Sequence, residues 1–237
     1  MEYKKFIFIL SVLVMRSISV VAQNNADKPV NDLDSALIEQ MSISVRQEVQ
    51  LFTSYLSSIV APKRARNKRE RETVMRNREL LKQEALDLFV GKGDKYDVVI
   101  YDFDNNPLDT IHHRPVIMQT MSLSNPIPKD TAMVKYLSYK VKQANSGLIT
   151  GTSLHIISYD WTRMKVDPPM KIGDGTYVID VYFQQEFGFV NRELRLKKID
   201  ITTKRVSCFV YVSETQSGTE FIIRLGDIRA EEIERWN

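Results

Sequence analysis

The sequence predicts an α+β fold in which long N-terminal helices are followed by a curved antiparallel sheet, with one further helix between strands. Up to about residue 90, apolar residues recur every three or four positions, which is the period of an amphipathic helix. From residue 96 onwards apolar residues mostly alternate with polar ones, which is the period of a strand. Short turns join the later strands, and short connections favour antiparallel pairing of neighbours.

Residues 1–22 have the layout of a secretory signal peptide. Two lysines precede the apolar run Phe6–Met15, and small residues precede Gln23, the expected mature N-terminus. Arg16 interrupts the apolar run, which falls short of the roughly 20 residues that cross a bilayer. We therefore expect an exported protein, periplasmic or associated with the cell envelope, with no integral membrane span after signal cleavage. A retained anchor is the less favoured alternative.

Residues 23–62 contain a predicted N-terminal amphipathic helix, which starts near Asn31 and ends at Pro62. One face carries an apolar stripe, called here the N-terminal stripe, made of Leu33, Leu37, Met41, Val45, Phe52, Leu56 and Ile59. An apolar stripe of this kind must be buried against another surface. The helix from Leu33 to Ile59 is therefore a candidate contact for a homodimer or for another envelope protein.

Residues 63–82 form a basic segment on the second predicted helix, with nine Lys or Arg side chains and three Glu. Arg66 and Glu70 are four residues apart, a spacing that favours ion pairs along a solvated helix face. Contact with an acidic partner or an anionic envelope surface is an alternative. The segment has no aromatic side chains to stack on bases and no known reading module, so we expect no nucleic acid partner. Gly91 and Gly93 end this helix.

Beyond Gly93 the pattern predicts strands and one helix. Two strands at 96–103 and 115–121 are joined by a turn-rich segment. A helix follows from about Lys129 to residues 145–147, with Met133, Leu137 and Val141 on its inner face. The remaining strands are predicted at 152–161, 176–187, 192–199, 204–212 and 220–228, and residues 233–237 form a C-terminal tail.

Alternation also predicts which faces of two strands point to the core. Asp180 points outward because the opposite face of its strand is the more apolar one, with Tyr177, Ile179, Val181 and Phe183. Cys208 shares a face with Val206 and Val210, which indicates a buried and inert thiol. It is the one cysteine of the sequence, so no intrachain disulfide can form.

Four stretches, "ALDLFVGKGDKY", "YVIDVYFQQEFGF", "DITTKRVSCFVYV" and "EFIIRLGDIRA", resemble uncharacterised exported bacterial proteins of the NTF2-like, or SnoaL-like, cone fold. The resemblance covers roughly residues 65 to 230 and implies an α+β domain over 63–232, to which the first helix is additional. Some members of that fold are isomerases or dehydratases. They place an Asp or His beside a Tyr in the open end of the cone, where a low dielectric can raise the pKa of a carboxylate.

Residues of these types are present, and His155, Tyr159 and Asp102 are the pocket candidates. None matches a family catalytic motif, so no catalytic role is assigned. The spacing of the acidic residues that begin at Asp102 resembles the start of a calcium loop, but Pro107 and His113 stand where that loop needs Gly and Glu. We expect no metal and no cofactor, because no zinc-ligand spacing or nucleotide-binding glycine motif is present either.

The favoured function is an exported, non-enzymatic envelope protein that acts as an interaction or ligand-binding module, for which a small apolar ligand is one candidate. The alternative is a small-molecule isomerase, dehydratase or hydrolase that uses the cone cavity. An open cavity where His155, Tyr159 and a carboxylate converge would favour the enzyme. A cavity filled by apolar side chains would favour the binding module.

Overall fold

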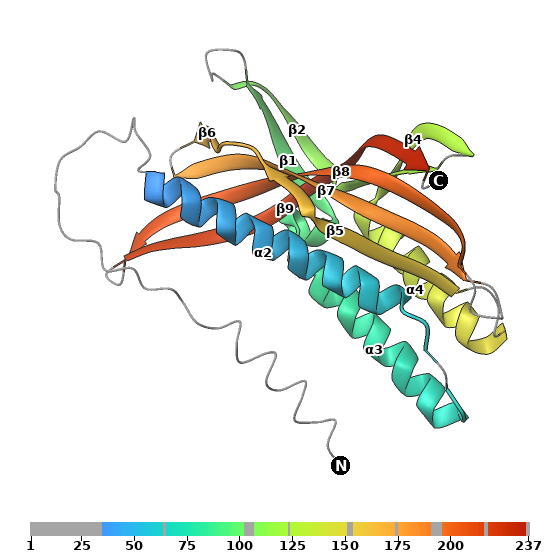
Figure 1. Ribbon diagram of the computed structural model, residues 1–237. Helices are drawn as coiled ribbons and strands as arrows, with labels where there is room; N and C mark the ends of the chain where they lie inside the picture. The colour runs from blue at the N-terminus through green and yellow to red at the C-terminus, as the bar shows by residue number, and fades with distance from the viewer. Residues whose placement is uncertain are drawn as a thin grey trace, which may run out of the picture.

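The computed structural model describes residues 35–63, 65–101, 107–122, 124–150, 154–173, 175–190, 196–215 and 218–235 (Figure 1). The predicted signal peptide at 1–22 and the pocket candidate Asp102 lie outside these ranges. Within them the fold is α+β, with three α-helices, an open seven-stranded mixed sheet and a separate two-stranded sheet. The predicted fold class is thereby confirmed at this level.

The three helices are α2 (Ser35–Val60), α3 (Lys68–Asp87) and α4 (Met133–Thr150), and a 3-10 turn at Val90–Gly93 follows α3. Two of the three helices, α2 and α4, pack against the large sheet, and α3 packs against these two helices (Figure 1). The side chain of Asn67 accepts a hydrogen bond from the Glu70 amide at 2.9 Å and caps the start of α3. Glu70 contacts Arg66 as its spacing predicted, but through the backbone amide of Arg66, at 2.7 Å.

The strands are β1 (Lys95–Tyr101), β2 (Pro107–Pro115), β3 (Ile117–Ser122), β4 (Asn125–Ala132), β5 (Leu154–Val166), β6 (Met170–Gly173), β7 (Thr176–Val190), β8 (Leu196–Thr215) and β9 (Gly218–Arg235). The large sheet has the order β4-β3-β9-β8-β7-β5, and β6 pairs with β7. All its pairs are antiparallel except β3 with β9. The predicted antiparallel pairing is confirmed for β5, β7, β8 and β9, but the two strands predicted at 192–199 and 204–212 are one strand, β8. The hairpin β1–β2 projects from the sheet (Figure 1).

Tertiary pairing overrides three of the predicted element boundaries. The turn-rich segment after β1 is largely strand β2, because it pairs with β1. Residues 125–132 are strand β4, since they pair with β3 and Gln119 bonds to Asp130 at 2.9 Å, so the helix starts at Met133. The stretch "DITT", predicted as a turn, lies inside β8 because β7 and β9 pair with it on both sides.

The N-terminal stripe is buried against this chain's own sheet. Helix α2 lies across β5, β7, β8 and β9, and its residues Met41, Val45, Val49, Phe52, Leu56 and Ile59 are at most 1% exposed. Phe52 packs edge to face on Phe89, with ring centres 5.0 Å apart. The apolar face that suggested a homodimer or envelope partner is therefore covered within one chain. Leu33 lies outside the described residues.

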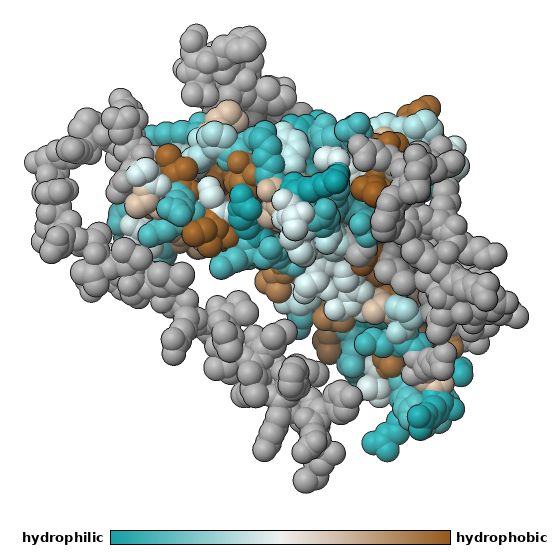
Figure 2. Space-filling view, viewed as in Figure 1, coloured by the Kyte–Doolittle hydropathy of each residue, from teal (hydrophilic) through white to brown (hydrophobic). Residues whose placement is uncertain are grey.

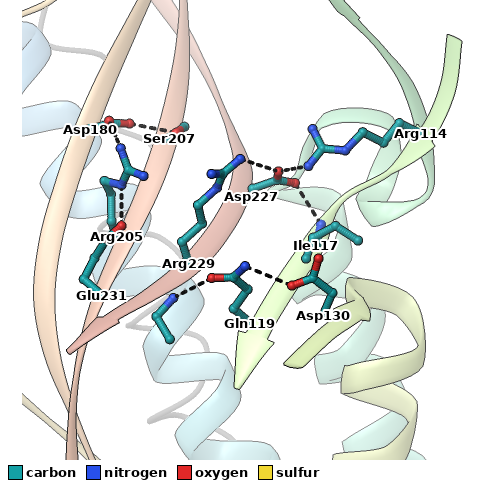
Figure 3. A network of polar contacts seen from close by, with 11 residues as sticks. Arg114, Ile117, Gln119, Asp130, Asp180, Arg205, Ser207, Asp227, Arg229 and Glu231 are labelled. Atoms are coloured by element: carbon teal, nitrogen blue, oxygen red, sulfur yellow. Dashed lines mark hydrogen bonds and ion pairs between the residues drawn. The ribbon is translucent and has the colours of Figure 1, made fainter. Parts of the chain in front are cut away.

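The predicted core faces of β7 and β8 are confirmed. Ile179, Val181 and Cys208 are fully buried on the face below the helices, and burial raises the pKa of the Cys208 thiol. Asp180 points to the opposite face, where it accepts hydrogen bonds from Ser207 at 2.7 Å and Arg205 at 3.2 Å (Figure 3).

The basic segment is mostly a solvated helix face, as predicted. The start of α3, at the lower right in both views, is strongly hydrophilic (Figure 2), and the Lys68 side chain is 90% exposed. Arg78 is different, because it is buried and donates to the carbonyl of Ala61 at 2.8 Å and to Asn145 at 3.1 Å. It thus ties the ends of α2 and α4 to α3. Among the described helices, none has the length and apolarity to span a bilayer.

Candidate functional site

An open groove of about 420 Å³ lies between α2 and the edge strand β5. Helix α2 contributes four polar residues and β5 contributes two aromatic ones, and the lining set is Gln50, Thr53, Ser54, Ser57, Tyr159 and Trp161. The polar residues recur every three or four positions on α2, so they form one line along the helix. This groove is the candidate binding site.

The floor of the groove is an aromatic platform. Tyr159 and Trp161 are alternate residues of β5 and therefore share a face of the strand. Their rings stack with centres 5.3 Å apart and planes at 20°. Phe183 of the neighbouring strand β7 supports both rings from the core side, at 5.9 Å from Tyr159 and 6.5 Å from Trp161. The platform is rigid because its members pack on the core.

The helix side of the groove carries hydrogen-bonding groups. The hydroxyl of Thr53 donates to the carbonyl of Val49 at 2.9 Å, and that of Ser57 donates to the carbonyl of Ile157 at 3.2 Å. Both donors are thus used within the chain, while the hydroxyl oxygens keep lone pairs that can accept. Gln50 and Ser54 are exposed and can donate or accept. The groove therefore offers an apolar plane on one side and neutral polar groups on the other.

A second feature, the inner polar patch, lies on the sheet below α4 and consists of Gln185, Asp200, Thr202 and Lys204. All four are at most 9% exposed. Gln185 pairs directly with Tyr159 on one side and Thr202 on the other, so the patch continues the row of the groove platform across the sheet. Polar side chains at this depth are uncommon on a core face and need specific partners.

Two lysines lie at or near the inner polar patch. The Lys204 ammonium, 3% exposed, donates to the carbonyl of Gln119 at 2.6 Å. Lys140 of α4 is partly exposed, and its ammonium nitrogen lies 4.8 Å from the centre of the Phe187 ring and 5.4 Å from that of Tyr136. Among the described side chains, neither ammonium group has a carboxylate partner.

This arrangement weakens proton binding by both lysines. Burial lowers the pKa of Lys140 to about 8. Burial, and then the positive charge of Lys140, lower the pKa of Lys204 to about 7.

Tyr159 connects the groove with the inner polar patch. Its ring lines the groove, whereas its hydroxyl is buried and has no hydrogen-bond partner within the described part of the chain. Burial, followed by the nearby Tyr136, raises the pKa of Tyr159 well above its ordinary range. The Tyr159 hydroxyl therefore stays protonated at neutral pH, as a donor that faces the interior.

The three pocket candidates have different outcomes. Tyr159 lines the groove between α2 and β5. His155 lies on β5 opposite Phe189, but its side chain is outside the described part, as is the whole of Asp102. The described residues that line the groove include no carboxylate and no histidine. In the described ranges, no cluster of three or more His, Cys, Asp or Glu side chains is arranged to hold a metal ion.

The sequence patterns did not single out Lys204, Lys140 or Trp161 as site residues. Lys204 is the first residue of the strand predicted at 204–212 and alternates in step with Val206 and Cys208, so the same alternation that buries Cys208 would have placed Lys204 inside. Lys140 lies three residues after Leu137 and adjoins the inner face of its helix. Trp161 is two residues after Tyr159 and therefore lies on the same face of the strand.

Another polar cluster holds the projecting hairpin to the sheet (Figure 3). The carboxylate of Asp227 on β9 is paired with Arg114 of β2 and accepts a hydrogen bond from the Ile117 amide of β3 at 2.9 Å. Burial, with Asp227 next, raises the pKa of Tyr96 on β1 to about 12. Asp227 thus joins four strands, which is a structural role.

Comparison with protein-family models, with curated proteins and with solved structures found no significant match to this chain.

Proposed function

We propose that this chain is an exported, non-enzymatic binding module that holds a small uncharged ligand in the groove between α2 and β5. The observation that carries the proposal is the groove itself, about 420 Å³ in volume, with a stacked Tyr159–Trp161 platform on one side and neutral hydrogen-bonding residues on the other. Ligand sites usually combine an apolar lining with a few placed polar groups, and their volumes start near 300 Å³.

The lining chemistry defines the class of ligand. Flat aromatic side chains favour a ligand with a planar or ring-shaped apolar face. Ser54, Gln50 and the hydroxyl oxygens of α2 favour hydroxyl or amide groups along one edge of that ligand. None of the described lining residues is charged, so an ionic ligand group would lose its hydration without a compensating partner among them.

Binding is favoured over catalysis because none of the described residues that line the groove is a proton acceptor near neutral pH. General base catalysis needs a group that is deprotonated near neutral pH and within hydrogen-bond reach of the substrate. The one titratable lining group is Tyr159, whose pKa is raised by burial. The isomerase, dehydratase or hydrolase alternative has no such observation in its favour.

The wider proposal is that the domain over residues 63–232 has the NTF2-like, or SnoaL-like, cone fold. It is supported by helices packed against a long-stranded, largely antiparallel sheet, with α2 as an addition to that plan. Export to the periplasm or cell envelope is supported by the signal-peptide layout of residues 1–22.

Tryptophan fluorescence tests the groove directly. The chain has two tryptophans, and Trp236 lies next to the C-terminus, so Trp236→Phe leaves Trp161 as the single reporter. The protein, without residues 1–22, is titrated with N-phenyl-1-naphthylamine, a neutral aromatic probe. We expect saturable quenching of Trp161 emission together with a rise in probe emission. Ser54→Phe, which fills the groove from α2, should abolish both signals.

Ser58→Phe is the matched control, because Ser58 is also exposed on α2 but does not line the groove. It should bind the probe like the parent. Equal probe binding by the Ser54→Phe and Ser58→Phe variants, or the absence of quenching in the parent, would overturn the groove proposal.

A further inference from the structure

We propose that the groove between α2 and β5 binds a neutral disaccharide, with a pyranose ring on the Tyr159–Trp161 platform and hydroxyl groups directed at α2. This inference rests on the proposed function, because it names the ligand class of that same site. Three observations carry it: the stacked rings on one side, the uncharged polar side chains on the other, and the open shape of the groove between them.

The helix side of the groove requires a ligand that donates hydrogen bonds. Thr53 is fully buried and its hydroxyl bonds to carbonyls of its own helix, so the accessible polar groups belong to Gln50, Ser54 and Ser57. The Ser57 hydroxyl donates to the Ile157 carbonyl at 3.2 Å, so its oxygen is left to accept. Gln50 and Ser54 can donate or accept. A ligand hydroxyl does both, whereas a ketone or an ether cannot donate to Ser57.

The length of this polar line indicates the size of the ligand. Gln50, Ser54 and Ser57 follow one another at spacings of four and three residues, so they lie along one face of α2. At about 1.5 Å per residue, the helix rises about 10 Å from Gln50 to Ser57. A single pyranose ring is shorter than this line, and a disaccharide matches it. The groove volume of about 420 Å³ is also in the ordinary range of small-ligand sites.

The aromatic side of the groove matches the face of a sugar ring. A pyranose with equatorial hydroxyls carries only C–H groups above and below its mean plane. These apolar, weakly positive groups pack on the negative face of an aromatic ring. Tyr159 and Trp161 are stacked with their planes at 20°, and Phe183 supports both. The platform is therefore formed before the ligand arrives, which lowers the cost of binding.

The open shape of the groove favours a sugar over a wholly apolar ring compound. A ligand in an open groove keeps one side in water. An apolar compound gains free energy in proportion to the area that it removes from water, so it forfeits part of that gain here. A saccharide buries its C–H face and keeps its outward hydroxyls hydrated. None of the described lining residues is charged, which favours a neutral sugar over an acidic or amino sugar.

Competition in the groove tests the ligand class. The Trp236→Phe protein, in which Trp161 is the reporter, is titrated with cellobiose, an all-equatorial disaccharide, and with sorbitol, an open-chain polyol without a ring face. Cellobiose should change Trp161 emission saturably and displace N-phenyl-1-naphthylamine competitively. Sorbitol should bind at least about tenfold more weakly, because it cannot stack on the platform.

Two glutamine variants separate the saccharide from the apolar probe. Gln50→Leu removes a hydrogen-bonding group from the groove, so it should weaken cellobiose binding about fivefold and leave binding of N-phenyl-1-naphthylamine unchanged. Gln47→Leu is the matched control, because Gln47 is also exposed on α2 but does not line the groove, and it should alter neither. Circular dichroism checks that both variants are folded. Ser54→Phe should abolish the binding of both molecules.

The outcomes distinguish this inference from the proposed function. If the probe binds but cellobiose does not displace it, the saccharide inference is overturned and the groove function stands. If neither molecule binds, the groove function itself fails. Equal cellobiose binding by the parent and Gln50→Leu, or a cellobiose response that survives Ser54→Phe, would overturn the placement of the sugar against α2. Sorbitol binding as tight as that of cellobiose would overturn the role of the platform.

Discussion

The buried amine of Lys204 predicts an unusual dependence of stability on pH. Its pKa falls from 10.5 to about 7 on folding, because burial and Lys140 disfavour the charged form. Between these two values the unfolded chain binds more protons at this position than the folded chain. The contribution of Lys204 to the free energy of unfolding therefore rises as the pH increases from 7 to 10.5.

The magnitude follows from the size of that pKa change. At 1.36 kcal/mol per pH unit, the penalty at pH 7 and below is about 5 kcal/mol, and it vanishes above pH 10.5. The Lys204→Met substitution removes this penalty but also removes the hydrogen bond to the Gln119 carbonyl, which costs about 1–3 kcal/mol. The variant should thus be more stable than the parent by about 2–4 kcal/mol at pH 7. It should be less stable by about 1–3 kcal/mol near pH 10.5.

Urea unfolding of parent and variant at half-unit steps from pH 7 to 10.5 measures the difference directly. Lys140 is present in both proteins, so most of its own contribution cancels. Lys135→Met is the matched control, because that side chain is exposed and its removal should shift stability by less than about 0.5 kcal/mol at every pH. A difference between the parent and Lys204→Met that stays constant with pH would refute the reasoning. It would show that Lys204 keeps an ordinary pKa in the folded protein.

Three further predictions concern packing and surface charge. Phe52→Ala should lower the free energy of unfolding by about 3–5 kcal/mol, because Phe52 is 1% exposed and packs on Phe89, and a lower urea midpoint at unchanged slope would show it. Asp227→Ala should lower the free energy of unfolding by about 3–5 kcal/mol, since it leaves the Arg114 charge and the Ile117 amide unpaired. A loss below about 1 kcal/mol in the same assay would contradict the role of Asp227 in holding these strands together. Lys68→Glu should change the melting temperature by no more than about 2 °C, because its side chain is 90% exposed; a larger drop by calorimetry would show that the basic segment is bound to the body.

Local patterns in the sequence were sufficient for the helices and for the core faces of the central strands. The spacing from Leu37 to Ile59 predicted α2 because the helical period is a local property of the chain. Alternation placed Ile179 and Cys208 inside, since a strand that is buried on one face must repeat every two residues. The same alternation pointed Asp180 outward, where it is found.

Strand boundaries depended on pairing, which the sequence expresses only weakly. Asp130 looks like the start of a helix, yet it belongs to a strand because β3 pairs with it and Gln119 bonds to it. Asp200 and Thr202 look like turn residues, yet both are buried in β8 because β7 and β9 flank them. Their local propensity loses to pairing on both sides of the strand.

The sequence by itself determined the helical and strand periods, the inner faces of β7 and β8, and the exposed character of most of the basic segment. Only the tertiary structure decided what covers the N-terminal stripe, where the groove opens beside Trp161, and that Lys204 is buried against the carbonyl of Gln119. Each of these depends on strand register and on how a helix crosses the sheet. Such contacts join residues far apart in the chain, whereas periodicity reports only on near neighbours.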